Sequence, residues 1–353
     1  MRHLRAIPAL LVIGLLGGCF GGGSGGLFMY VANRGGTTLS QYRVTGAGVM
    51  SPLAAATVTV GIGPAGIASS PNSAYVYVAN SNDDTVSMLR VTSNGELAPL
   101  APATIASGGS PIGIAAHPTK DVVYVANSDD DTVSQFSINV DGTLAPLAPA
   151  TITTGDYPVH ITVSPNGNFV YVSAYGDDAI YQYSVNPDGT LAPLAPAFAA
   201  TAGGPWTTVI NGPGTRLYCG DSNANAVSQF AIAADGTLSA LVPPSVPSGI
   251  ENYAAALNRG GQFLYASAYA SGDLFQYSVA PDGRLTPLIP PSVTGVGTFA
   301  WPVVSSPKTN AIFVCWQGTD NVSSYRLDTS GQLVLLDTEP AGNEPASILF
   351  LSR

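Results

Sequence analysis

The chain has 353 residues, of which 46% are hydrophobic and 10% are charged, and its 22 acidic residues outnumber 12 basic ones. A surface with this net negative charge repels nucleic acids and anionic lipid head groups, so neither is expected as a partner. The chain has three cysteines, and two of them, Cys219 and Cys315, fall in distant parts of the sequence. We expect them to be free, buried thiols because a disulfide needs closely spaced Cα atoms.

The first 18 residues have the pattern of a secretory signal peptide. A basic start precedes an apolar run at 6–16, which is too short to span a bilayer as a helix. The run ends in Leu-Gly-Gly-Cys, which resembles the bacterial lipobox and implies cleavage before Cys19 and lipidation of its sulfur. Residues 19–26 are rich in glycine and predict a flexible tether. We therefore expect an exported protein whose only membrane contact is a lipid anchor, at the outer membrane and facing the periplasm.

From residue 27 onward the chain repeats itself seven times. The marker aromatic residues recur 47 residues apart, with a last step of 48, and they are Tyr30, Tyr77, Tyr124, Tyr171, Tyr218, Tyr265 and Phe313. A period of this length, made of short strands and turns, is typical of β-propeller blades. The sequence predicts an all-β domain over 27–353, a seven-bladed β-propeller with four antiparallel strands per blade.

The third repeat shows the expected strands of one blade. They run over 111–118, 122–127, 132–139 and 143–152. Asp141-Gly142 tolerates positive φ and predicts a tight hairpin before the last strand. The last strand is rich in proline, which cannot donate to a ladder and therefore predicts an outer edge strand.

The two ends of the repeat region predict how the ring closes. Residues 27–33 match the second strand of a blade, and no first strand precedes them. Residues 345–352 match the first strand of the third repeat. We expect the C-terminal strand to join the N-terminal blade as its innermost strand.

Neither the acidic clusters nor the isolated histidines have the spacing that predicts a metal site. The clusters Asp83-Asp84, Asp129–Asp131 and Asp177-Asp178 precede strands at equivalent places, so they predict Asx-turns and not a calcium loop. His117 occupies a corner between strands and predicts a surface turn residue. We expect no metal and no cofactor.

The repeats resemble a known family. The Tyr-Val-Ala-Asn strands, the Ser-Pro-Asn-Gly corner at 164–167 and the Asp-Gly-Thr-Leu hairpins are similar to those of seven-bladed lactonase-type propellers. That group includes 6-phosphogluconolactonases, carboxymuconate cyclases and exported Tyr-Val-Thr-Asn repeat proteins. The resemblance implies a catalytic His, Arg and Glu at positions that hold Val159, Trp206 and Ser222 in this chain. His160 lies one residue away, where a strand turns the side chain to the other face.

Aligning the blades exposes large side chains where blades two and three have small ones. They fall at the starts of innermost strands and in the loops after second strands, which meet at one mouth of a propeller channel. The resulting candidate ligand-binding residues are Trp206, Tyr253, Trp301, Tyr175, Tyr269, Trp316, Glu251, Glu344, Asp221 and Arg34. Aromatic faces suit sugars or cationic groups, so we expect a small molecule of these kinds or a protein ligand.

Three interpretations of function remain open. The first is a monomeric, lipid-anchored propeller that binds a ligand or partner through an aromatic, acid-rimmed pocket at the mouth. The alternative is a lactonase with a rearranged active site, in which His160 is the candidate catalytic residue beside neighbouring carboxylates. The third is a structural envelope protein, in which the aromatic residues pack between the blades.

Overall fold

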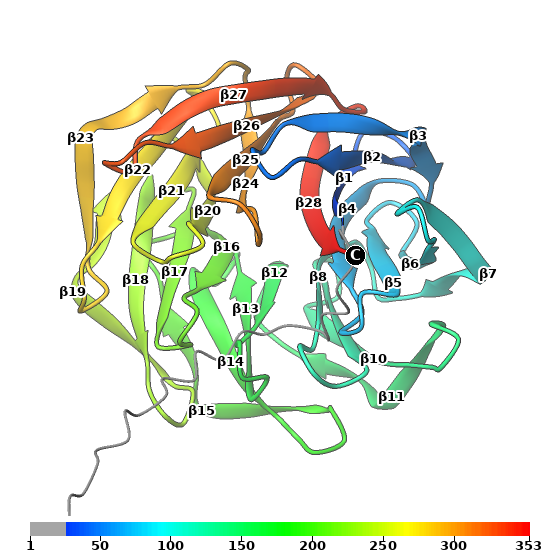
Figure 1. The fold of residues 1–353 in the computed structure, drawn as a ribbon. Helices are drawn as coiled ribbons and strands as arrows, with labels where there is room; N and C mark the ends of the chain where they lie inside the picture. Colours follow the sequence, from blue (N-terminus) through cyan, green and yellow to red (C-terminus); the bar gives the residue numbers. More distant parts are fainter. Residues whose placement is uncertain (1–25) are drawn as a thin grey trace, which may run out of the picture.

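The computed structural model describes residues 26–353, and all regular elements of this part are β-strands. Seven four-stranded antiparallel sheets form a ring around a central channel (Figure 1). The predicted fold class and number of blades are therefore confirmed. The proposed signal peptide, Cys19 and nearly all of the proposed tether lie outside the described residues.

Each blade contributes one strand to each of four concentric positions. The innermost strands are β4 (Pro64–Ser69), β8 (Pro111–Ala116), β12 (Pro158–Val163), β16 (Pro205–Ile210), β20 (Asn252–Leu257), β24 (Ala300–Ser305) and β28 (Pro345–Ser352). The second strands are β1 (Leu27–Asn33), β5 (Tyr75–Asn80), β9 (Val122–Asn127), β13 (Phe169–Ala174), β17 (Arg216–Asp221), β21 (Phe263–Ala268) and β25 (Ala311–Trp316).

The outer two positions follow the same order. The third strands are β2 (Thr38–Val44), β6 (Thr85–Val91), β10 (Thr132–Ile138), β14 (Ala179–Val185), β18 (Ala226–Ile232), β22 (Asp273–Val279) and β26 (Asn321–Leu327). The outermost strands are β3 (Met50–Thr59), β7 (Leu97–Ala106), β11 (Leu144–Thr153), β15 (Leu191–Ala200), β19 (Leu238–Pro247), β23 (Leu285–Thr294) and β27 (Leu333–Pro340). The proline-rich segments form outer edge strands, as predicted.

The C-terminal strand closes the ring. Blade one has the strand order β28-β1-β2-β3, so β28 is its innermost strand. The pairing with β1 runs from Leu27 opposite Ser352 to Asn33 opposite Pro345. This confirms the predicted closure, in which the two ends of the chain share one sheet.

The marker tyrosines and the hairpin glycines that recur in the sequence bind each other across blade interfaces. The Tyr124 hydroxyl donates to the carbonyl oxygen of Gly189 in the next blade at 2.6 Å, and Tyr218 donates to Gly283 at 2.6 Å. Six of the seven interfaces have this bond, donated by Tyr30, Tyr77, Tyr124, Tyr171, Tyr218 and Tyr265. At the last interface Phe313 has no hydroxyl and packs against Phe350 instead, with ring centroids 4.9 Å apart.

The aspartates of the acidic clusters accept hydrogen bonds from the backbones of other loops, and so they do more than form local Asx-turns. Asp130 accepts a hydrogen bond from the backbone N–H of Gly109 in its own blade at 2.7 Å. Asp131 accepts from the backbone N–H of Tyr157 in the next blade at 3.0 Å. Their structural role was predicted, but the partners were not, because these loops are far apart in sequence. Within residues 26–353, no group of three metal-ligating side chains is found.

His117 is buried, so the prediction of a surface residue was wrong. Its Nε2 lies 2.8 Å from the carbonyl oxygen of Gly167 in the next blade, and its Nδ1 accepts from the N–H groups of Thr119 and Lys120. Burial lowers the pKa of His117. The corner residue faces the neighbouring blade, and this packing was not visible in the repeat.

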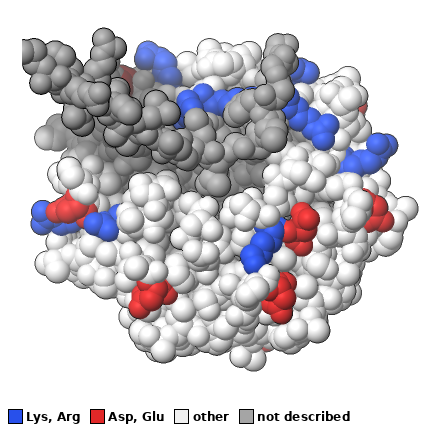
Figure 2. All heavy atoms as spheres, turned by 60° about the horizontal axis from the view of Figure 1, so that its bottom comes forward, with Lys and Arg blue, Asp and Glu red and all other residues white. Residues whose placement is uncertain are grey.

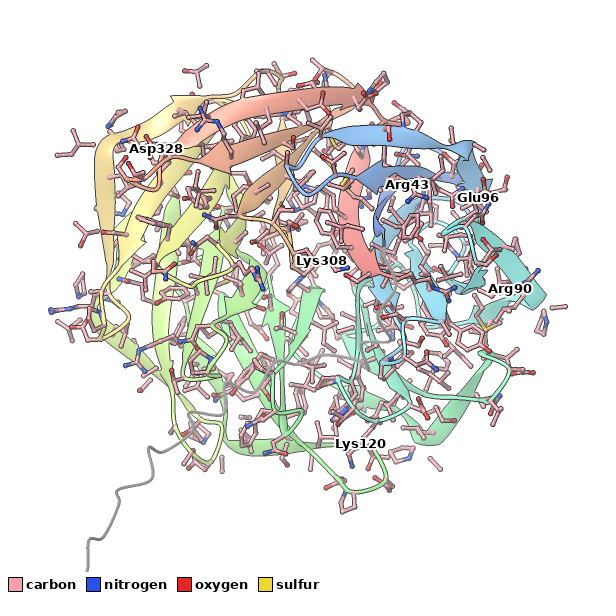
Figure 3. The ribbon with its side chains drawn as sticks, viewed as in Figure 1. Arg43, Arg90, Glu96, Lys120, Lys308 and Asp328 are labelled. Atoms are coloured by element: carbon pink, nitrogen blue, oxygen red, sulfur yellow. The ribbon has the colours of Figure 1, made fainter. Side chains whose placement is uncertain are left out.

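Charged residues are sparse, and most of those labelled in Figure 3 lie toward the outside of the ring, whereas Lys308 is labelled near its centre. Arg90, Glu96, Lys120 and Asp328 lie toward the periphery of the ring (Figure 3), and the face shown in Figure 2 has scattered single charges on a largely uncharged surface. Cys219 and Cys315 are free and buried, as predicted. In the described part of the chain no helix is long and apolar enough to cross a membrane.

Candidate functional site

The mouth is bordered by a ring of residues that immediately precede the innermost strands. All seven have left-handed backbone conformations, with φ between 48° and 68°, and they are Gly63, Ser110, Tyr157, Gly204, Glu251, Phe299 and Glu344. Their backbones are fixed from both sides. The N–H of Glu251 donates to Asn225 of the preceding blade at 2.8 Å, and its carbonyl oxygen accepts from the N–H of Tyr269 at 3.0 Å.

Four of these seven positions carry large or charged side chains despite the left-handed conformation. Glycine adopts this conformation freely and occupies it at Gly63 and Gly204, whereas another residue costs about 1 kcal/mol or more. The strained positions are Tyr157, Glu251, Phe299 and Glu344. Strain of this kind concentrates at functional sites, so these side chains are candidates for contact with a ligand.

Trp206 is the centre of a packed aromatic cluster at the mouth. Its ring centroid lies 4.8 Å from that of Tyr253, 5.5 Å from that of Tyr175 and 5.9 Å from that of Trp301. Each pair has an edge-to-face geometry, which is the favoured arrangement of aromatic quadrupoles. The structure therefore brings four of the predicted aromatic residues together.

The cluster also includes the predicted Tyr269 and two residues that sequence comparison missed, Tyr157 and Phe299. Tyr253 meets Tyr269 at 4.9 Å, and Tyr269 stacks on Phe299 at 4.9 Å. Tyr157 meets Tyr175 at 6.1 Å. Tyr157 and Phe299 occupy the position of Glu251 and Glu344 in their own blades, so an alignment of that position was the available signal.

An apolar layer forms the floor of the mouth. Ala65, Ile112 and Val159 are buried and pack together, with Tyr175 and Trp206 against them. These three residues start the innermost strands of blades two to four, and Trp206 starts that of blade five. Trp206 and Trp301 also line the cavity of the channel, so the aromatic cluster lies between the mouth and the channel.

The three positions that the family resemblance marked as catalytic have no ionisable group in this structure. Val159 is 2% exposed within the floor, and Trp206 is the centre of the cluster. The Ser222 hydroxyl is buried and donates to the carbonyl oxygen of Gly204 at 3.2 Å. Val159, Trp206 and Ser222 thus stand where the resemblance implies an imidazole, a guanidinium and a carboxylate.

The charges at the mouth come from Glu251, Glu344 and Arg34. Burial raises the pKa of Tyr269, the negative charges of Glu344 and Glu251 raise it further, and Arg34 lowers it. Burial, together with Glu251, raises the pKa of Tyr253 to about 12, so its hydroxyl remains a donor at neutral pH. Arg34 and Glu344 also line a shallow pocket of about 540 Å³. Three of the four predicted charged residues thus lie close enough to Tyr269 to affect its pKa.

Two predicted site residues, Trp316 and Asp221, are fully buried and give the mouth no surface. The Trp316 indole N–H donates to Ser323 at 3.0 Å. Asp221 accepts from the Ser228 hydroxyl at 2.5 Å, and burial raises its pKa to about 7. Both end second strands, where the side chain is covered by the loop that leads into the innermost strand: Trp316 lies against Gly295 and Gly297, and Asp221 lies beside Thr201 and Ala202. Their assignment to the mouth was wrong because loop position was read without side-chain direction.

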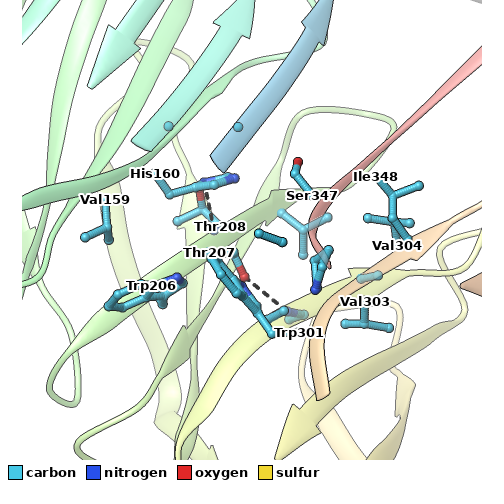
Figure 4. Close-up of a pocket in the computed structure, with 18 of the residues that line it drawn as sticks. Val159, His160, Trp206, Thr207, Thr208, Trp301, Val303, Val304, Ser347 and Ile348 are labelled. Carbon is cyan, nitrogen blue, oxygen red and sulfur yellow. Dashed lines mark hydrogen bonds between the residues drawn. The ribbon is translucent and has the colours of Figure 1, made fainter. Parts of the chain in front are cut away.

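His160 lies in the channel beneath the floor and not beside the rim carboxylates (Figure 4). The register of β12 shifts between Pro158 and His160, so Val159 is the extra residue of a bulge. Val159 and His160 both line the channel cavity, and the two side chains point in different directions (Figure 4). The channel cavity has no Asp or Glu in its lining. The described residues therefore do not form the pairing of His160 with a carboxylate that the lactonase alternative required.

Comparisons with known proteins place the chain in a family. Residues 23–105, 92–213 and 197–347 match a family model described as lactonase, 7-bladed beta-propeller. No curated protein matches the chain significantly.

Solved structures share the fold over nearly the whole chain. A candidate 6-phosphogluconolactonase from Bacteroides fragilis has a TM-score of 0.82 at 19% identity, over 93% of this chain and 98% of that one. The periplasmic gluconolactonase PpgL from Pseudomonas aeruginosa has a TM-score of 0.78 at 20% identity, over 92% and 99%. A Lactobacillus plantarum protein has a TM-score of 0.78 at 21% identity, over 93% and 99%. The likeness to these structures shows the fold, and the family model covers most of the sequence. The chain belongs to the lactonase family of seven-bladed β-propellers.

Proposed function

We propose that this protein binds the ring of an uncharged lactone, such as a sugar lactone, on the aromatic cluster and hydrolyses it with Glu251 as general base. Membership of the lactonase family supports the substrate class. The geometry that carries the proposal is the strained Glu251, with φ of 58°, directly preceding the strand that presents Tyr253 to the centre of the cluster.

The residues of the mouth favour an uncharged substrate. Flat aromatic faces stack well on the apolar faces of sugar rings, and tyrosine hydroxyls add hydrogen bonds. A phosphorylated or carboxylated lactone needs several cationic groups, because multiple charge-assisted hydrogen bonds hold such anions. Arg34 is the single basic residue among the mouth residues described above, and two glutamates accompany it.

The chemistry requires a base and donors at the ring carbonyl. Glu251 would remove a proton from water as its oxygen attacks the carbonyl carbon, and the ring C–O bond then breaks. The proton returns to the ring oxygen, which leaves as the new hydroxyl, so the product is the open hydroxy acid. Neutral tyrosine hydroxyls at the mouth are the available donors to the oxyanion.

A pH-stat assay over a panel of lactones tests this function. Glucono-δ-lactone and its 6-phosphate are compared after subtraction of spontaneous hydrolysis, and we expect activity on the first to exceed that on the second. Glu251→Gln should lower kcat roughly 100-fold, the usual scale of a general base. Glu96→Gln is the matched control, because Glu96 lies at the periphery and should leave the rate unchanged. Wild-type hydrolysis by Glu251→Gln would contradict the assigned role.

The second candidate function is ligand binding without hydrolysis. It is supported by Val159, Trp206 and Ser222 at the family's catalytic positions, and by glutamates beside aromatic rings, a combination that suits cationic ligands. Titration of glycans, peptides and amines while tryptophan emission is recorded tests it. A response that disappears in Trp206→Ala, together with inactivity on every lactone, would favour this candidate.

The cellular location is proposed from the sequence of the N-terminus. The lipobox-like segment ending at Cys19 supports export and lipid anchoring, and a structural neighbour is named a periplasmic gluconolactonase. Cys19→Ser should move the protein from the membrane fraction to the soluble fraction of cells. Retention of this variant in the membrane fraction would contradict the anchor.

A further inference from the structure

A separate cavity of about 390 Å³ lies in the channel beneath the aromatic floor. All seven innermost strands line it, and the floor residues Val159, Trp206 and Trp301 form its end toward the mouth. Its size falls within the range of small-molecule sites, which are commonly concave, apolar and largely pre-formed.

The cavity exists because the third residue of each innermost strand is small, with one exception. These residues are Gly66, Gly113, His160, Thr207, Ala254, Pro302 and Ser347. At Gly113 the strands approach so closely that an added Cβ would lie 2.8 Å from the Cα of His160. His160 is thus the single large side chain of this layer, and Figure 4 shows it extending into the space opposite Ser347.

Hydrogen bonding determines which nitrogen of His160 faces the cavity as a donor. The backbone N–H of Thr208 in the next blade donates to Nδ1 at 3.3 Å, so Nδ1 is unprotonated. Burial lowers the pKa of His160 to about 4, so the ring is neutral at pH 7 and its proton resides on Nε2. No protein acceptor is found for Nε2 within the described residues.

Trp301 has a second unused donor, which lies behind the same wall and is not exposed to the cavity. Its side chain is 7% exposed, it lines the cavity, and its indole N–H has no hydrogen-bond partner among the described residues. A buried donor without an acceptor is costly. Because this nitrogen is covered by protein atoms, Trp301 contributes the face of its ring to the cavity and not its N–H.

The remaining lining restricts the chemistry of that occupant. It contains no Asp, Glu, Lys or Arg, and aliphatic side chains such as Ile67, Ile114, Leu257 and Ile348 predominate. An ionic ligand would lose its hydration without gaining a partner of opposite charge.

We propose that the channel cavity is a second binding site, which takes an uncharged, mainly apolar small molecule whose carbonyl or ether oxygen accepts from His160 Nε2–H. This site shares Trp206 and Trp301 with the mouth, but its polar contact, His160, takes no part in the proposed lactone site. The inference does not rest on lactone hydrolysis.

Camphor, camphene and camphor-10-sulfonate are suitable probes because they share one bicyclic skeleton. Camphor has a carbonyl acceptor, camphene has none, and the sulfonate adds a charge. Calorimetry should show camphor binding at least about tenfold more tightly than camphene, as expected for one hydrogen bond. We expect no binding of the sulfonate. The indole ¹H–¹⁵N signal that disappears in Trp301→Phe should shift when camphor is added.

Two cavity variants and one control complete the test. Ser347→Phe fills the space from the wall opposite His160 and should abolish camphor binding, whereas Ser239→Phe on the outermost strand β19 should leave it unchanged. His160→Leu should weaken binding about tenfold. Equal camphor affinity in Ser347→Phe and wild type, or no binding by wild type because water alone fills the channel, would overturn the inference. Lactone hydrolysis is also measured in Ser347→Phe, so that the function proposed for the mouth is tested separately from the channel site.

Discussion

Blades two and three differ from blades five to seven at the mouth but share their framework. At the start of the innermost strand the first pair has Ala65 and Ile112, whereas the second group has Trp206, Tyr253 and Trp301. Both regions nevertheless have the hydrogen bond from the marker tyrosine to the hairpin glycine of the next blade, at Tyr77 and Tyr124 and again at Tyr218 and Tyr265, and only blade seven lacks it among the blades compared.

This difference shows that the framework and the mouth are specified by different residues. Blade contacts depend on side chains in the second and third strands. An example is Gln135, which accepts from the N–H of Leu191 at 2.7 Å, and Gln229 does the same for Leu285. The first residues of the innermost strands and the loops above them are free to vary without disturbing those contacts. The repeated architecture therefore tolerates an aromatic site on one side of the ring.

The largest expected effect comes from breaking the framework that both regions share. A chain that ends at Asn343 lacks β28, the innermost strand of blade one, and leaves β1 with an unpaired edge facing the channel. We expect loss of the cooperative thermal transition, measured by circular dichroism. Removal of Arg353 alone is the control and should lower the melting temperature only slightly. If the long truncation melted like the full chain, the closure would not stabilise the ring.

A smaller effect distinguishes the two regions by the pH dependence of stability. Asp221 in blade five occupies the position of Asn127 in blade three, and burial raises its pKa from 3.8 to about 7. The folded protein thus keeps a proton that the unfolded chain releases. The contribution of Asp221 to stability is fully present below about pH 4 and is lost as the pH rises to about 7, by at most about 4 kcal/mol. Asp221→Asn should remove this decline.

The reciprocal substitution sharpens the same comparison. Asn127→Asp should introduce a similar loss of stability with rising pH into blade three, because Asn127 is fully buried. Urea unfolding at several pH values measures both variants. The control, Asp188→Asn, removes an exposed carboxylate whose pKa is lowered by hydrogen bonds from Thr190. This substitution should change the free energy of unfolding only at the low pH at which an aspartate side chain takes up its proton. An unchanged pH profile in Asp221→Asn would rule out Asp221 as the source.

The smallest effect should be the same in both regions. Tyr124→Phe and Tyr218→Phe each leave a buried glycine carbonyl without its donor, which should cost about 1–2 kcal/mol of unfolding free energy. Chemical denaturation measures the two losses, with Tyr181→Phe as a control whose hydroxyl lies at an exposed turn. Clearly unequal losses at Tyr124 and Tyr218 would show that the frameworks of the two regions differ.

Sequence comparison located much of the candidate site because the repeat makes equivalent positions recognisable. Trp206, Tyr253 and Tyr175 were predicted together and are in contact. It failed for Trp316 and Asp221 because the loop that leads into the innermost strand covers the last residue of the second strand. The position of a residue in a repeat specifies its place along the chain, whereas side-chain direction depends on local bulges and packing.

The 47-residue period by itself determined the fold, the number of blades and the closure by the C-terminal strand, since each repeat is one unit that must bury its faces against two neighbours. Only the tertiary structure decided which side chains meet. The bulge at Val159 directs His160 into the channel, and left-handed residues direct Glu251 and Glu344 to the rim. Residues of different blades come together there through the curvature of the ring, a property of all seven sheets that no single repeat contains.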